Sequence, residues 1–97
     1  MASKMEYLDF VLEQLDLLDN ITYRSMMGEF LLYYHQVLIG GIYDDRLLVK
    51  IVNENKKYGM KEAIPYHGAN PMYLVSEIDD KELLKNIVLD TYNDLKK

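Results

Sequence analysis

Apolar residues recur at helical spacing near the start of the chain. They lie three or four positions apart, with acidic residues such as Glu6, Asp9 and Glu13 between them. The apolar set is Met5, Leu8, Val11, Leu12, Leu15 and Leu18. This period predicts an amphipathic helix that ends near Asp19-Asn20. Ser3 and Glu6 have the spacing of a capping box, so we expect the helix to begin there.

A second helical pattern occupies the end of the chain. It opens at Asp79, where Asp80 and Glu82 place negative charge at the positive end of a helix dipole. The positions on its apolar side are Leu84, Ile87, Val88, Thr91 and Leu95. We expect this helix to run almost to the C-terminus.

Between the two helical patterns, the chain reads as strands separated by short turns. Two-residue turns are expected at Gly28-Glu29, His35-Gln36 and Asp44-Asp45, where glycine and aspartate accept the backbone angles that tight hairpins require. These turns predict a four-stranded antiparallel meander. Gly40-Gly41 then falls inside a strand, where it permits a bulge or a close approach, and the surrounding residues do not form a phosphate-binding pattern.

A fifth strand is expected at Met72–Ser76, after a polar segment that forms a loop or one short helix. The predicted order is α-β-β-β-β-(short α or loop)-β-α. The fold class is therefore α+β, with an antiparallel sheet of about five strands and both terminal helices packed on it. With 97 residues, the chain has the size of a single domain, residues 1–97.

The hairpin register divides the strands into two faces. One face is almost purely apolar and is expected to receive both helices; its members are Leu31, Tyr33, Leu38, Gly40, Ile42, Leu47, Val49 and Ile51. The other face, which also includes Tyr23, Met27 and Val37, is expected to stay uncovered. Its candidate interface residues are Phe30, Leu32, Tyr34, Ile39, Tyr43, Leu48 and Val52. Two alternatives remain open: a helix covers this face, or a one-residue slip at His35-Gln36 exchanges the faces downstream.

Charge and composition narrow the classes of partner. The net charge is −5, which opposes binding to the phosphate backbone of nucleic acids. No apolar run is long enough to span a bilayer, and Met1-Ala2-Ser3-Lys4 does not begin a signal peptide, so we expect a cytoplasmic protein without a membrane anchor. The chain has no cysteine. We expect a homodimer or a protein partner.

The residue patterns of catalytic and metal sites are missing. His35 and His67 are the only histidines, and neither has a second ligand at metal-binding spacing. No Ser-His-Asp set is suggested by the layout, so we expect no catalytic, metal or cofactor residues. Arg24 is expected to extend from an edge strand to water, and the alternative is a ligand site or enzyme that uses Arg24, Tyr66 and His67.

Four segments of the chain resemble the N-terminal domain of TfoX/Sxy-type competence regulators. The segments are TYRSMMG (22–28), FLLY (30–33), GIYDDRLLVK (41–50) and PYHGANPMY (65–73). They occur in the family's order, but Gly28-Glu29 stands for a glycine pair and His35-Gln36 for an Asp-Gly turn. The resemblance implies an α+β domain that regulates transcription of DNA-uptake genes without catalysis. The longer regulators act with the cyclic-AMP receptor protein and carry a C-terminal helical domain to which the resemblance does not extend.

Overall fold

The computed structural model describes residues 3–97 and has the α+β architecture that the sequence predicts. In chain order the elements are α1 (Met5–Gln14), β1 (Ile21–Met26), β2 (Glu29–Tyr34), β3 (Val37–Ile42), β4 (Leu47–Val49), the 3-10 helix η1 (Asn53–Tyr58), β5 (Lys61–Ala63), β6 (Met72–Leu74) and α2 (Lys81–Leu95). The strands form one six-stranded antiparallel sheet in the order β1-β2-β3-β4-β6-β5. The prediction missed β5, because Lys61-Glu62-Ala63 lacks the apolar alternation of a strand.

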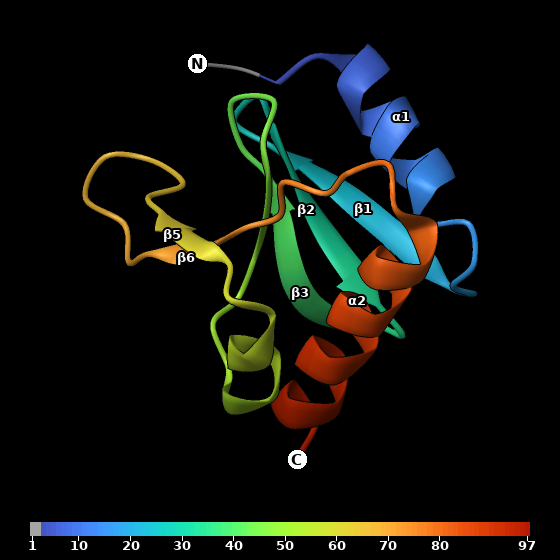
Figure 1. Cartoon of the computed structure of the whole chain (residues 1–97). Coiled ribbons are helices and arrows are strands. Elements are labelled where there is room, and N and C mark those ends of the chain that lie inside the picture. Colours follow the sequence, from blue (N-terminus) through green and yellow to red (C-terminus); the bar gives the residue numbers. More distant parts are fainter. Residues whose placement is uncertain (1–2) are drawn as a thin grey trace.

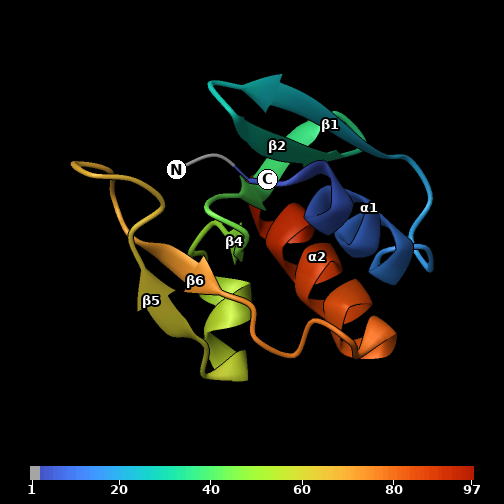
Figure 2. The same cartoon turned by 90° about the horizontal axis from the view of Figure 1, so that it is seen from above.

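Both long helices lie against the same side of the sheet (Figure 1). From above, the sheet curls around α2, with β1 and β2 on one side of the helix and β5 and β6 on the other (Figure 2). The core combines Leu8 and Val11 of α1, Leu84 and Ile87 of α2, and alternate residues of the central strands. Burial of this shared apolar surface is what joins the helices to the sheet.

The face assignment made from the register is wrong for β2, and a β-bulge is the reason. Tyr33 pairs with Leu38 as expected, but Leu32 pairs with Gly40, so Ile39 is an extra residue on β3. Beyond the bulge, the β3 residues share a face with the other set of β2 residues, so Ile42 lies beside Phe30 and not beside Leu31. The helices therefore pack on Phe30, Leu32 and Tyr34 of β2 together with Ile42 of β3.

The first hairpin turn lies one residue earlier than predicted. Met26 pairs with Glu29, which makes Met27-Gly28 the two-residue turn, with φ angles of 52° and 83°. The other two turns agree with the prediction: His35-Gln36 has φ angles of 48° and 68°, and Asp44-Asp45 has 54° at both residues. Positive φ at both central residues is the backbone of type I′ hairpin turns, which match the twist of the flanking strands.

The start of α1 also differs from the prediction. Lys4 is the N-cap and its side chain makes no capping bond, so the expected capping box of Ser3 and Glu6 does not form. Instead, the Ser3 hydroxyl donates to Glu29 Oε1 at 2.6 Å and accepts from the Asp45 backbone N–H at 3.0 Å. Ser3 thus ties the N-terminal segment to two hairpin tips, which are distant in sequence and invisible to local pattern analysis.

The end of α1 differs from the prediction, whereas the start of α2 agrees with it. The α-helix α1 stops at Gln14, short of the predicted Asp19-Asn20, and Leu15 and Leu18 reach the core from the turns that follow. Met5, assigned to the apolar side, is half exposed at 52 %. At the other helix, Asp80 caps α2 by accepting from the Leu83 backbone N–H at 3.1 Å, as its position predicts.

Candidate functional site

The candidate interface is not exposed. Six of its seven side chains are buried: Phe30, Leu32, Tyr34, Ile39, Tyr43 and Leu48. Val52 alone is partly exposed. The bulge on β3 brings Ile39 and the apolar residues of β2 onto the face that the helices cover, while Tyr43 is buried beside the crossing segment 64–71. Buried side chains cannot contact a partner. The prediction that this set forms an interface is therefore wrong, and its six buried members belong to the interior.

Large exposed apolar side chains occur on β1 and its turn, and others occur on α1, at Leu17 and in the connection between β5 and β6. β1 forms one edge of the sheet, and five of its six residues are exposed. Tyr23 and Met26 are 43 % and 41 % exposed, and Met27 in the adjoining turn is 96 % exposed. A methionine so exposed, in a left-handed conformation that long side chains rarely adopt, is unusual for a residue without a partner. β1 is therefore the strongest candidate for an interaction surface.

The opposite edge of the sheet has a different character. β5 contains only three residues, and two of them, Lys61 and Glu62, are charged and exposed. Short edge strands with charged side chains resist pairing with other chains. β1 has six residues, a single charge at Arg24 and no proline. Of the two free edges, β1 is the one that lacks these features that resist pairing with another chain.

Arg24, Tyr66 and His67 do not form one site. Arg24 is exposed on β1, which supports the edge position expected for it, while Tyr66 and His67 are exposed in the connection between β5 and β6. Tyr66 lines an open cavity of about 510 Å³ between this connection and the sheet. Arg24 and His67 do not line it, so the three side chains do not converge on a ligand.

Arg46 shapes this cavity, and pattern analysis missed it. Its Nε donates to the Tyr43 carbonyl at 3.1 Å, and one terminal nitrogen donates to the Ile64 carbonyl, also at 3.1 Å. Arg46 thereby holds the crossing segment against the hairpin, where Tyr43 and Tyr66 place their ring centroids 6.1 Å apart. Burial, followed by the nearby Tyr66, raises the pKa of Tyr43. No local pattern signals this role, because Ile64 lies 18 residues further along the chain.

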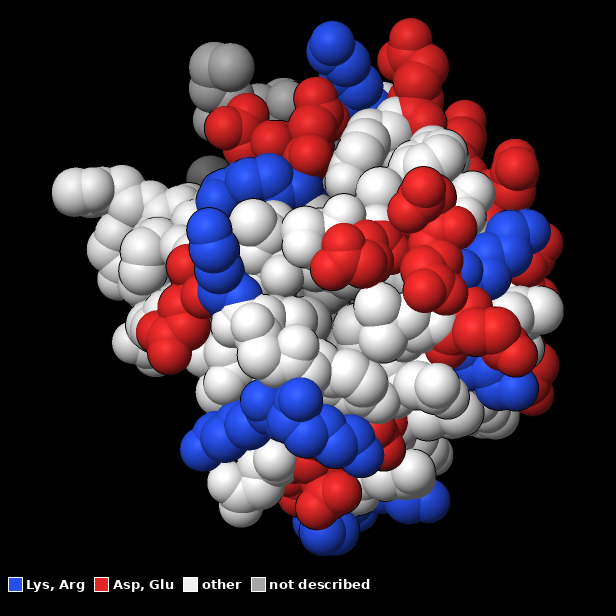
Figure 3. All heavy atoms as spheres, viewed as in Figure 1, with Lys and Arg blue, Asp and Glu red and all other residues white. Residues whose placement is uncertain are grey.

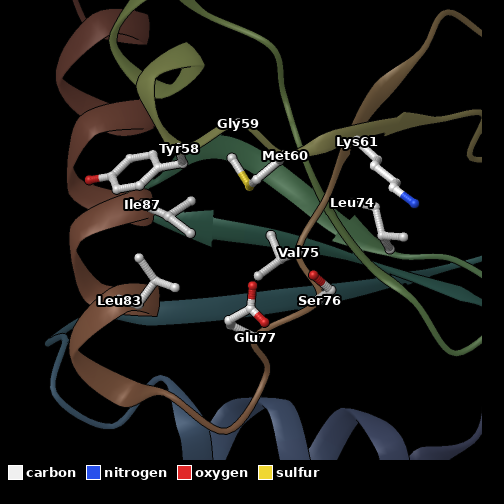
Figure 4. A pocket seen from close by; sticks show the side chains of 10 residues that line it. All are labelled: Tyr58, Gly59, Met60, Lys61, Leu74, Val75, Ser76, Glu77, Leu83 and Ile87. Atoms are coloured by element: carbon white, nitrogen blue, oxygen red, sulfur yellow. The ribbon is translucent and has the colours of Figure 1, made fainter.

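A second cavity, of about 350 Å³, lies between the η1–β5 segment and the segment that leads from β6 into α2 (Figure 4). Apolar side chains such as Met60, Val75 and Ile87 form its floor. Lys61 extends its ammonium group away from this cavity, and Tyr58 turns its hydroxyl toward α2. There, Tyr58 donates to Asp90 Oδ2 at 2.5 Å. No catalytic pair converges in this cavity.

His35 belongs to a small polar cluster with Tyr34 and Asp19, where the β2–β3 turn meets the connection between α1 and β1. Its Nε2 lies 3.4 Å from Asp19 Oδ1, and the Tyr34 hydroxyl donates to the same oxygen at 3.1 Å. The hydrogen bond from Tyr34, followed by the charge of His35, favours the carboxylate and lowers the pKa of Asp19. Burial raises the pKa of Tyr34. The cluster fixes the turn against the chain that enters β1, which is a structural role.

On the face seen in Figure 3, acidic and basic side chains are mixed. Acidic side chains gather over α1, and basic and acidic residues alternate elsewhere on the same face of the molecule (Figure 3). Among residues 3–97, no group of three or more histidine and acidic side chains is close enough to hold a metal ion. Within the same range, none of the helices combines the length and the apolar character that a bilayer crossing needs.

The comparisons with known proteins add no assignment. No protein-family model matches the chain, and no curated protein matches it either.

Proposed function

We propose that this chain is a non-catalytic protein-interaction domain that takes part in regulating transcription and binds its partner by strand addition at β1. In strand addition, an extended segment of the partner pairs with the free edge of a sheet, and backbone hydrogen bonds supply much of the affinity. The observation that carries the proposal is the unprotected edge of β1, with Tyr23, Met26 and Met27 exposed beside it.

The regulatory part of the proposal is supported by the resemblance to the N-terminal domain of TfoX/Sxy-type competence regulators. The resemblance rests on segments that include β1, its turn and the β3–β4 hairpin. Its implied partner is the cyclic-AMP receptor protein at promoters of DNA-uptake genes. The net charge of −5 favours action through a DNA-bound protein over direct contact with DNA.

A mobility-shift experiment tests this function. The native chain should add to a complex of the cyclic-AMP receptor protein with promoter DNA, and Tyr23→Pro should add at least tenfold more weakly. Proline at this position removes a backbone donor from the free edge. Glu62→Ala on β5 is the matched control and should bind as the native chain does. Absence of any added complex with the native chain, or equal binding by Tyr23→Pro, would contradict the proposal.

A further inference from the structure

We propose that two copies of this chain pair β1 with β1 in antiparallel orientation, centred on Tyr23, and so join their sheets into one. This inference rests on the proposed strand addition and names a second copy as the chain whose strand is added to β1, so that the regulatory protein would meet the dimer. It follows from three observations: which backbone groups of β1 point outward, how side chains alternate along the strand, and where Arg24 lies.

The backbone groups of alternate residues in β1 point away from β2. In an antiparallel ladder, hydrogen-bonded pairs alternate with pairs that exchange no bonds. The His35 N–H donates to the Asn20 carbonyl at 3.3 Å, so the bonded positions continue at Thr22, Arg24 and Met26. The N–H and C=O groups of Ile21, Tyr23 and Ser25 therefore face the free edge. Among residues 3–97, no backbone or side-chain hydrogen bond outside the sheet reaches these three residues.

Side-chain alternation restricts how two such edges can pair. Two copies related by a two-fold axis perpendicular to the sheet place residues opposite each other only when both point to the same face. Within β1, the centre of the pairing must then be a residue and not a peptide bond. Three residues can be the centre of a pairing that includes most of the strand: Thr22, Tyr23 and Arg24.

Tyr23 is the best centre of the three. A pairing centred there places Tyr23 opposite Tyr23 and Ile21 opposite Ser25, all with outward-facing backbone groups, and forms about six hydrogen bonds between the copies. Thr22 then lies opposite Arg24. A pairing centred on Arg24 would oppose two guanidinium groups, which is destabilising, and one centred on Thr22 would leave Ser25 beyond the partner's strand.

The exposure of the Tyr23 ring favours a second copy of the chain as the partner of β1. The Tyr23 ring already packs edge-on against Phe30, with centroids 5.9 Å apart, and remains 43 % exposed. Two such rings meeting across the axis would extend an aromatic row from β2 of one copy to β2 of the other. The contrast with β5, which is short and charged, explains why the joined edge is β1.

Sedimentation equilibrium of the full chain tests the pairing. The native chain should be a dimer at micromolar concentration, whereas Tyr23→Pro should be monomeric with a native circular-dichroism spectrum, because the backbone N–H that proline removes faces outward and makes no bond to β2. Tyr23→Lys serves as a second variant: it keeps the backbone donor but places two cations opposite each other, and should raise the dissociation constant at least tenfold. Glu62→Lys on β5 should dimerise like the native chain.

Single cysteines test the register, because the native chain contains none. Cysteines introduced as Tyr23→Cys should be joined efficiently by a short bifunctional thiol reagent. Cysteines introduced as Ser25→Cys would lie about 13 Å apart along the strands and should be joined poorly. Preferential joining through Arg24→Cys or Thr22→Cys would overturn the register.

The outcomes separate this inference from the proposed function. A native chain that stays monomeric, or a dimer unaffected by both Tyr23 variants, overturns the self-pairing. If a monomeric native chain still adds to the regulator complex and Tyr23→Pro does not, strand addition to another protein survives. If the chain dimerises through β1 but never joins that complex, the self-pairing stands and the regulatory function falls.

Discussion

Asn55 is a polar side chain with no exposed surface, and its amide group makes three hydrogen bonds, one of them to the distant helix α2. Its amide nitrogen donates to the Lys50 carbonyl at 2.8 Å and to Thr91 Oγ1 at 2.9 Å. Its oxygen accepts from the Val52 N–H at 3.2 Å. Asn55 thus locks η1 against α2. Within residues 3–97, no buried side-chain polar atom lacks a partner.

Asn55→Ala should lower the free energy of unfolding by about 3 kcal/mol, because it leaves several buried polar groups without partners. Urea unfolding measures the loss. Asn53→Ala, at an exposed position two residues earlier, is the control and should change the free energy of unfolding by less than about 0.5 kcal/mol. Equal effects of the two substitutions would show that the network around Asn55 contributes nothing of its own.

Tyr58 connects the acid–base chemistry of one side chain to the stability of the fold. Burial, followed by its hydrogen bond to Asp90, raises the pKa of Tyr58 from 10.0 to about 12. The unfolded chain therefore loses this proton at lower pH than the folded chain does. The contribution of Tyr58 to stability is complete below pH 10 and is lost as the pH rises toward 12.

The free energy of unfolding of the native chain should fall more steeply between pH 10 and pH 12 than that of Tyr58→Phe. Thermal unfolding at intervals across this range measures the two slopes. Tyr66→Phe, at an exposed position, should retain the native slope. A native slope in Tyr58→Phe would mean that Tyr58 does not carry the alkaline sensitivity.

At the scale of elements, the bulge on β3 determines which side chains form the core. Gly40 lies directly after the extra residue Ile39, and β4 approaches it closely. A Cβ at Gly40 would lie 2.1 Å from the Leu48 carbonyl oxygen and 2.8 Å from the Val49 Cα. Only glycine fits between these backbone atoms. The prediction that the glycine pair permits a bulge or a close approach is confirmed.

Gly40→Ala should lower the free energy of unfolding by about 3 kcal/mol or prevent folding, because the clash is with backbone that cannot move aside. Gly59→Asn is the control: its position has nothing within 4 Å, and asparagine tolerates its φ of 66°. Chemical unfolding compares the two. A stable Gly40→Ala protein would show that β4 can shift away from the bulge.

At the scale of the whole molecule, net charge opposes association between copies. Each copy carries −5, so a dimer brings together two bodies of like charge. Added salt screens this repulsion, and the screening distance falls from about 30 Å at 0.01 M to about 3 Å at 1 M. The proposed β1 pairing consists of backbone hydrogen bonds and apolar contacts, which salt does not weaken in the same way.

The dissociation constant of the dimer should therefore fall several-fold as ionic strength rises over this range, measured by sedimentation equilibrium. Binding to DNA phosphates would behave in the opposite way, weakening with salt. Tyr23→Lys dimers should respond to salt more strongly than native dimers, because the two added cations meet at the axis. A dimer that dissociates as salt is added would point to an interface held by ion pairs.

The local sequence by itself determined the helices, most of the strands and two of the three turns. Helical period, the cap at Asp80 and the turn residues His35-Gln36 and Asp44-Asp45 act over a few neighbours, so pattern analysis could find them. The exposed position of Arg24 could be predicted for the same reason. β5 was missed because its stability comes from pairing with β6 and not from its own residues.

Only the tertiary structure decided which face of the sheet is covered and where the exposed surface lies. A single extra residue, Ile39, changes which side chains of β2 share a face with the later residues of β3, so the β2 residues expected to stay uncovered lie under the helices with Ile42. The same applies to the bonds of Ser3 with Asp45 and of Arg46 with Ile64, which join residues 42 and 18 positions apart. Such contacts depend on how the chain folds back on itself, which is why the candidate site moved from the interior of the sheet to the edge of β1.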